Sequence, residues 1–115
     1  MEINLLLNSL KTNPSERFES ETIEFKNYSN ENALHNAKDL TEEISAIANR
    51  NGGRIIVGVI DSSDIKHNNW TQQLNGFQNV DLDTTKERLL GKIFPKIDLR
   101  LEEIIHESKN YLIIH

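Results

Sequence analysis

The chain has 115 residues, of which 37% are hydrophobic and 27% charged, with a net charge of −5 and no cysteine. This composition is typical of one globular domain with a single core, and it excludes disulfides, thiolate metal sites and a cysteine nucleophile. The acidic charge argues against a protein that coats nucleic acid non-specifically, and no apolar run reaches the ~20 residues of a membrane span.

Residues 1–14 predict a short amphipathic N-terminal helix. Their apolar side chains recur at helical spacing, and Pro14 ends the pattern; the apolar positions are Ile3, Leu6, Leu7 and Leu10. The segment lacks the basic start and cleavage site of a signal peptide, so we expect a cytoplasmic protein. Residues 22–26 then alternate polar and apolar, which predicts a strand that buries Ile23 and Phe25 on one face.

The middle of the chain predicts a helix followed by a central strand. A polar loop over 27–32 leads to a helical face over 34–49, and Gly52 and Gly53 end that helix. "RIIVGVI", residues 54–60, is apolar on both faces, so we expect it in the middle of a sheet covered on both sides. Asp61 follows directly.

The last third predicts a helix and two strands. Residues 62–81 are polar and irregular and are expected to form a long loop or lid. A helix is expected over 83–94, strands over 97–104 and 111–115, and a turn between the strands. The order α-β-α-β-α-β-β predicts an α/β or α+β domain with a mixed sheet. Because the chain ends within a strand, we expect it to be truncated at its C-terminus.

Three acidic residues and one lysine form the candidate site. Glu24 and Lys26 lie two apart in a strand and therefore share a face. Asp61 ends the central strand, where α/β sheets tend to place their sites, and it can approach Glu24 if the two strands are neighbours. Glu19 joins them only if the chain bends around residues 20–21.

Carboxylates without cysteine or clustered histidine suit Mg²⁺ or Mn²⁺. With such ions they are typical of phosphodiester cleavage, because the metal polarises the phosphoryl oxygen and generates hydroxide, while a lysine offsets the developing charge. Two alternatives stay open. Glu24 and Lys26 suit a solvated strand face, and Asp61 suits a turn or helix cap.

A basic strip is the second candidate feature. Residues 86–100 carry a net charge of +3, and Arg88 and Lys92 lie one helical step apart, with Lys96 shortly beyond. These three, with Lys26, are candidate phosphate contacts. The alternative is an ordinary charged outer face of a helix.

Three stretches, "ESETIEFK", "LTEEISAIANRNGGRIIVGVID" and "IFPKIDLRLEEI", resemble the AlbA-like domain of the Schlafen family. The resemblance implies a single domain over 15–115 after the N-terminal helix, with the motifs beginning at Glu19. It also implies nucleic-acid binding and, by matching positions, a Mg²⁺- or Mn²⁺-dependent ribonuclease site acting on structured RNA such as tRNA. Glu19, Glu24 and Asp61 would hold the metal, with Lys26 beside them as a phosphate contact.

Two other functions remain open at this point. The first is a non-catalytic DNA-binding or transcription-regulatory module of a larger bacterial protein, and the second is a pure interaction domain. The expected partner is nucleic acid, RNA rather than DNA, together with further domains of the same protein or a second copy of the chain. A membrane partner is not expected.

Overall fold

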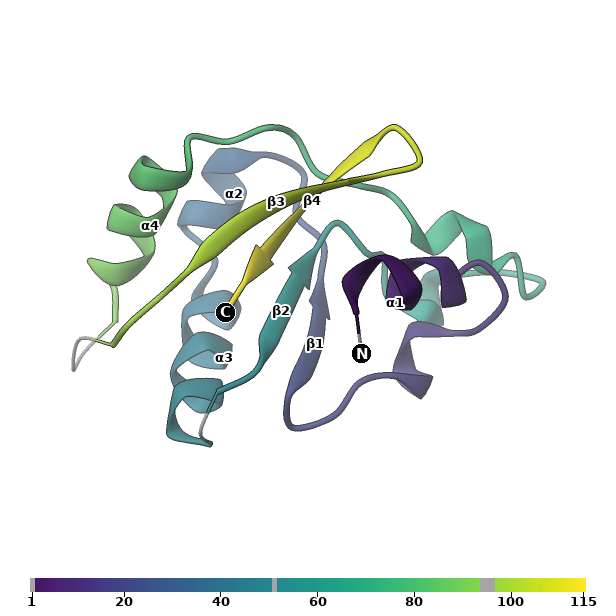
Figure 1. Ribbon diagram of the computed structural model, residues 1–115, viewed down its shortest axis with the longest axis horizontal. Helices are drawn as coiled ribbons and strands as arrows, with labels where there is room; N and C mark the ends of the chain where they lie inside the picture. Colours follow the sequence, from purple (N-terminus) through teal and green to yellow (C-terminus); the bar gives the residue numbers. More distant parts are fainter. Residues whose placement is uncertain (1, 51, 94–96) are drawn as a thin grey trace.

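The computed structural model describes residues 2–50, 52–93 and 97–115. Four strands form one mixed sheet in the order β1-β2-β4-β3 (Figure 1). The strands are β1 (Ile23–Lys26), β2 (Arg54–Val57), β3 (Leu101–His106) and β4 (Lys109–Ile114). β1 runs parallel to β2, whereas β4 is antiparallel to both of its neighbours. The predicted α+β class with a mixed sheet is confirmed.

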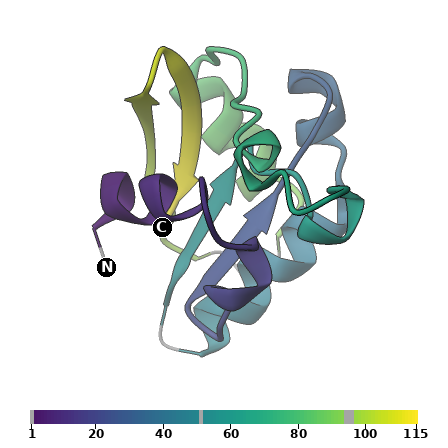
Figure 2. The ribbon, with the colours of Figure 1, turned by 90° about the vertical axis from the view of Figure 1, so that its right-hand side faces the viewer.

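Helices cover both faces of the sheet. They are α1 (Ile3–Ser9), α2 (Glu31–His35), α3 (Lys38–Asn49) and α4 (Leu82–Leu90). Apolar residues of α1 pack with Ile56 on one face, and those of the other three helices pack with Ile55 on the opposite face. Figure 2 shows β1 and β2 between α1 on one side and α2 and α3 on the other. The prediction that β2 is central and covered on both sides is therefore confirmed.

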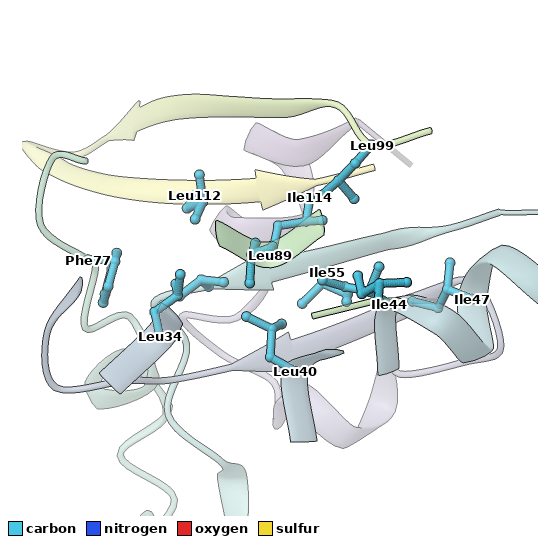
Figure 3. Packing of buried hydrophobic residues seen from close by; sticks show 12 residues of the cluster. Leu34, Leu40, Ile44, Ile47, Ile55, Phe77, Leu89, Leu99, Leu112 and Ile114 are labelled. Carbon is cyan, nitrogen blue, oxygen red and sulfur yellow. The ribbon is translucent and has the colours of Figure 1, made fainter. Parts of the chain in front are cut away.

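Apolar side chains of α3 anchor the larger core cluster. Leu40, Ile44 and Ile47 recur at helical spacing and are at most 6% exposed. They belong to one cluster with Ile55 of β2 and Ile114 of β4 (Figure 3). Burial of each such side chain contributes roughly 1.5–3 kcal/mol relative to exposure, so this face holds α3 against the sheet.

The single helix predicted over 34–49 is two helices. α2 begins at Glu31, because the side-chain oxygen of Asn30 accepts the Ala33 N–H at 2.8 Å and caps its first turn. The break follows at Asn36, whose amide donates back to the Asn32 carbonyl at 2.9 Å. Ala37 is extended, with ψ 107°. The end of the predicted polar loop is therefore helical.

The segment after β2 also differs from its prediction. β2 ends at Val57 because Gly58 takes φ +122°, which interrupts the extended chain. The loop or lid predicted over 62–81 is a long loop with two 3₁₀ helices, Ser62–Asp64 and Trp70–Gln73. Its side chains Gln73, Leu74 and Phe77 are at most 8% exposed. The loop is therefore packed into the domain.

The remaining elements follow the predictions with shifted ends. α4 ends at Leu90, and the predicted closure of this helix at residues 94–95 lies outside the described residues. The strand predicted over 97–104 begins at Leu101, and the connection to β4 is the two-residue turn Glu107–Ser108. Among the described helices, none is long and apolar enough to cross a membrane.

Candidate functional site

A polar pocket of about 350 Å³ lies at the carboxyl ends of β1 and β2. The four predicted site residues line it together, along with two acids that the sequence did not single out. We call it the acidic pocket, and its charged lining residues are Glu19, Glu24, Lys26, Asp39, Asp61 and Asp64. The first acidic block and the end of the central strand therefore line the same pocket.

The alternation of β1 places two of these side chains. Ile23 and Phe25 pack with the α1 cluster on one face of the sheet, so Glu24 and Lys26 point to the other face. β1 and β2 are parallel neighbours with Lys26 opposite Val57. The chain leaving β2 therefore passes the end of β1, which brings Asp61 to the same pocket.

Glu19 reaches the pocket through the bend that the sequence required. The Ser20 N–H donates to the Ile23 carbonyl at 3.0 Å, and the Thr22 N–H donates to the Ser20 hydroxyl at 3.2 Å. The chain turns back over residues 20–22 before β1 begins. This turn places Glu19 beside Glu24, although an unbroken strand would have separated them.

The carboxylates of the acidic pocket repel one another. Burial raises the pKa of Glu19, and the charges of Glu24 and Asp61 raise it further. Burial and the nearby Glu43 raise the pKa of Glu24, and Lys26 partly opposes this. Acids that disfavour one another's ionised form create a place where a bound cation is stabilising.

Asp61 has a structural role as well as its place in the pocket. Its Oδ1 accepts the Ser63 N–H at 2.9 Å and caps the 3₁₀ helix Ser62–Asp64. This hydrogen bond lowers the pKa of Asp61, so the carboxylate is ionised at neutral pH. The helix cap suggested by the sequence is therefore present, and Asp61 lines the acidic pocket while it caps the helix.

Lys26 is oriented by an acid on α3. Its Nζ lies 3.2 Å from Oδ2 of Asp39, and the Tyr28 hydroxyl donates to the same oxygen at 3.2 Å. The Lys26 side chain is 20% exposed. Asp39 was not among the predicted site residues. In the sequence Asp39 appears only as an acidic residue in the first turn of a helix. An acid at that position is usually explained by its favourable interaction with the helix dipole.

The carboxylates of the acidic pocket are chemically suited to a hard divalent cation. Carboxylate oxygens are what Mg²⁺ and Mn²⁺ prefer. Across residues 2–50, 52–93 and 97–115, however, no three His, Asp or Glu side chains stand close enough together to hold an ion. Within the described part of the chain, the carboxylates therefore share one pocket without being arranged as a metal site.

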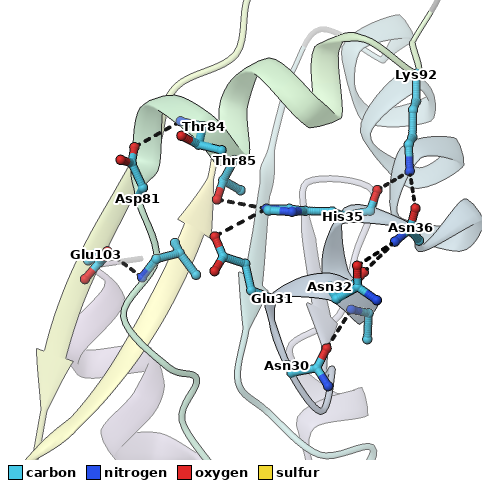
Figure 4. Close-up of polar contacts among 12 residues, drawn as sticks. Asn30, Glu31, Asn32, His35, Asn36, Asp81, Thr84, Thr85, Lys92 and Glu103 are labelled. Carbon is cyan, nitrogen blue, oxygen red and sulfur yellow. Dashed lines mark hydrogen bonds and ion pairs between the residues drawn. The ribbon is translucent and has the colours of Figure 1, made fainter.

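The predicted basic strip is placed elsewhere. Lys92 lies just beyond α4, and its Nζ donates to the carbonyl of His35 and, at 2.9 Å, to the side-chain oxygen of Asn36 (Figure 4). Arg88 is exposed. Neither residue lines the acidic pocket, and Lys96 lies outside the described residues. Lys92 therefore ties α4 to α2, a role that the sequence did not indicate.

His35 forms the buried contact between the same two helices (Figure 4). It is 5% exposed, and its Nε2 lies 3.1 Å from the Thr85 hydroxyl. Burial lowers its pKa; Glu31 opposes this shift, and Arg88 and Lys92 reinforce it. His35 is therefore a core residue that joins α2 to α4.

Comparison with known proteins supports the fold and one family. The family model described as "Schlafen, AlbA_2" matches residues 19–115. The crystal structure of the DIP2311 protein from Corynebacterium diphtheriae is similar, with a TM-score of 0.66 and 17% sequence identity. The match covers 98% of this chain and 23% of that one, so the chain spans about a quarter of its structural relative. The comparison with curated proteins found no match.

Proposed function

Because the chain belongs to the Schlafen AlbA_2 family, we propose that it binds nucleic acid and cleaves RNA with a divalent metal ion. The observation that carries this proposal is the acidic pocket, in which Glu19, Glu24, Lys26 and Asp61 meet from three separate segments. A solvated strand face would not need acids from a preceding turn and a following loop to converge on it.

Each residue has a role that follows from its position. Glu19, Glu24 and Asp61 would hold Mg²⁺ or Mn²⁺, and the ion supplies phosphoryl polarisation and a hydroxide nucleophile. Lys26 contacts the phosphate and offsets charge that develops on its oxygens. Asp39 positions Lys26 through their ion pair. Structured RNA such as tRNA is the proposed substrate.

The rival function is nucleic-acid binding without cleavage. It is favoured by the absence, within the described residues, of three side chains already arranged to hold an ion. In that case the acidic pocket serves the fold, and contacts to nucleic acid lie elsewhere on the surface. The two functions make different predictions for the same set of variants.

A cleavage assay with matched variants separates them. Wild type, Glu24→Gln and Asp61→Asn are incubated with tRNA and with single- and double-stranded DNA, in Mn²⁺ or in EDTA. Asparagine can still cap the 3₁₀ helix, so Asp61→Asn removes the charge and keeps the turn. Glu21→Gln is the control, because Glu21 is exposed and does not line the pocket.

We expect cleavage of tRNA in Mn²⁺ and none in EDTA. Glu24→Gln and Asp61→Asn should lose about 100-fold or more, as enzymes do when one preorganised electrostatic group is removed, and Glu21→Gln should retain full activity. Equal behaviour of wild type and all variants in every condition would exclude the ribonuclease. Binding without cleavage by every protein would support the rival function.

A further inference from the structure

Three polar pockets lie in a row along one end of the sheet. The acidic pocket shares Asn27 with a second pocket of about 400 Å³, which we call the amide pocket. The amide pocket shares Lys109 with a third pocket of about 190 Å³, which we call the lysine pocket. Because each pocket shares a wall residue with the next, the three lie side by side from the end of β1 to the β3–β4 turn, and we call this row of pockets the track.

Close backbone packing builds the amide pocket. Gly58 and Gly76 both have positive φ, and a Cβ on Gly58 would lie 2.9 Å from the Gly76 carbonyl carbon and from the Tyr111 ring. The Phe77 N–H donates to the Asn110 carbonyl at 2.6 Å. These contacts press residues 74–78 against the start of β4, so the wall of the pocket is set by the backbone.

The lining of the amide pocket suits a nucleobase. Asn75 donates to the side-chain oxygen of Asn27 at 3.1 Å. Among the described residues, the Asn27 amide hydrogens and the Asn75 oxygen have no partner and can bond to a ligand. Gln78 is exposed at the rim. Side-chain amides match the donor and acceptor edges of bases, and the aromatic ring of Tyr28, half-buried in the wall, offers a surface for stacking.

The lysine pocket suits a phosphate. It is lined by Lys11 and Lys109, with Glu107 as an acidic member that pairs with Lys11. Lys109 donates to the Leu74 carbonyl at 2.6 Å, which fixes its ammonium at the pocket wall. The pocket is also lined by His106, whose Nε2 has no hydrogen-bond partner among the described residues. Glu107 balances one of the two ammonium groups, and the charge of the other remains, so an anion is favoured there.

Resting on the proposed function, we propose that a single-stranded segment of the substrate follows this track. The cleaved phosphate lies at the acidic pocket, the adjacent base enters the amide pocket, and a neighbouring phosphate binds at Lys11 and Lys109. The base must be unpaired, because a pocket that contacts its edges and face competes with base pairing and stacking. The track therefore selects unpaired stretches of RNA, such as loops and single-stranded ends.

The structure also offers a matched control at the opposite end of the sheet. Lys86 and Arg100 line a separate hollow beside His115, near the end of β4. They carry the same charge as the track lysines and share no pocket with them. If net charge alone attracts nucleic acid, Lys86→Gln and Lys109→Gln should have equal effects.

Binding of a fluorescently labelled single-stranded RNA oligonucleotide tests the track. Binding is measured in EDTA, so that it is separate from cleavage, over a range of salt concentrations. The variants are Lys11→Gln, Lys109→Gln and Gln78→Ala, with Lys86→Gln as the control. Lys109→Gln also removes the hydrogen bond to the Leu74 carbonyl and can disturb the fold. Gln78 is exposed, so Gln78→Ala tests the track with the fold intact.

We expect each track lysine variant to weaken binding about 5-fold and to lower the salt slope by about 0.7, the value of one phosphate contact on a single strand. Gln78→Ala should weaken single-strand binding about 5-fold without changing that slope. Lys86→Gln should change neither. An equal effect of Lys86→Gln, or no effect of the three track variants, overturns the proposal.

Cleavage assays keep the two proposals apart. Binding along the track without any cleavage overturns the ribonuclease and leaves the track standing. Cleavage of tRNA that is unaffected by Lys11→Gln, Lys109→Gln and Gln78→Ala overturns the track alone. Absence of RNA binding by the wild type overturns both.

Discussion

Replacing Gln73 by leucine tests how the N-terminal segment is held in place. Gln73 is fully buried, and its amide donates to the carbonyls of Leu10 at 3.0 Å and Asn13 at 2.9 Å. Its oxygen accepts the Ser15 N–H at 2.7 Å. One side chain thus joins the second 3₁₀ helix of the long loop to the segment that leads to Glu19.

Leucine fills a similar volume but offers no hydrogen bonds. It leaves the buried Ser15 N–H and two carbonyls without their partner, and each unsatisfied buried group costs roughly 1–3 kcal/mol. Allowing for partial relaxation, we expect the free energy of unfolding to fall by about 3 kcal/mol. For a domain of this size, that loss lowers Tm by about 10 °C.

Urea and thermal unfolding measure the effect, with Gln72→Leu as the control. Gln72 lies next to Gln73 in the same 3₁₀ helix and is exposed, so its replacement should change stability by less than about 0.5 kcal/mol. If Gln73→Leu is as stable as Gln72→Leu, the hydrogen bonds of Gln73 do not hold the segment, and the reasoning is refuted.

Three further predictions concern the site, one buried histidine and the hairpin. Lys26→Met should lower RNA cleavage about 10- to 100-fold, and Asp39→Asn by less, because Lys26 contacts the phosphate and Asp39 only positions it; equal losses in single-turnover rates would contradict these roles. Burial lowers the pKa of His35 below its ordinary 6.5, so the unfolded chain binds its proton more readily and stability should fall as pH drops below about 6.5; urea titrations of His35→Gln should lack this contribution. Ser108→Gly should stabilise the protein by about 0.5–1 kcal/mol in urea, because Glu107 and Ser108 both have positive φ in the hairpin turn; destabilisation would show that the Ser108 side chain makes a needed contact.

The local patterns of the sequence predicted the parts of the site that depend on strand geometry. Alternation over residues 22–26 was enough to place Glu24 and Lys26 on one face, and the apolar run before Asp61 was enough to place its strand at the centre of the sheet. Both follow from the two-residue period of a strand and from the burial of continuous apolar runs.

Three other features could not be predicted from periodicity. Glu19 joins the pocket through a turn held by one backbone hydrogen bond of Ser20. The apolar spacing of α2 continues into α3, so the periodicity runs through the break at Asn36 without a signal. Gln73 looks like an exposed loop residue in the sequence, and its burial depends on partners about 60 positions away.

The track of pockets was also beyond local pattern. Its amide pocket joins the end of β1, the long loop and the start of β4, which lie far apart in the sequence. Its chemistry comes from neutral amides and from lysines that are isolated in the sequence. Two cations of the basic segment that the sequence did single out, Lys86 and Arg100, lie at the opposite end of the sheet.

Cleavage of tRNA by wild type, Glu24→Gln and Glu21→Gln in Mn²⁺ and in EDTA tests the central claim most directly. Glu24 lines the acidic pocket and Glu21 does not, although the two acids lie three residues apart and their variants change the charge equally. We predict Mn²⁺-dependent cleavage by wild type and Glu21→Gln and a loss of about 100-fold or more in Glu24→Gln. Cleavage by Glu24→Gln at the wild-type rate, or no cleavage by any of the three, would contradict the account.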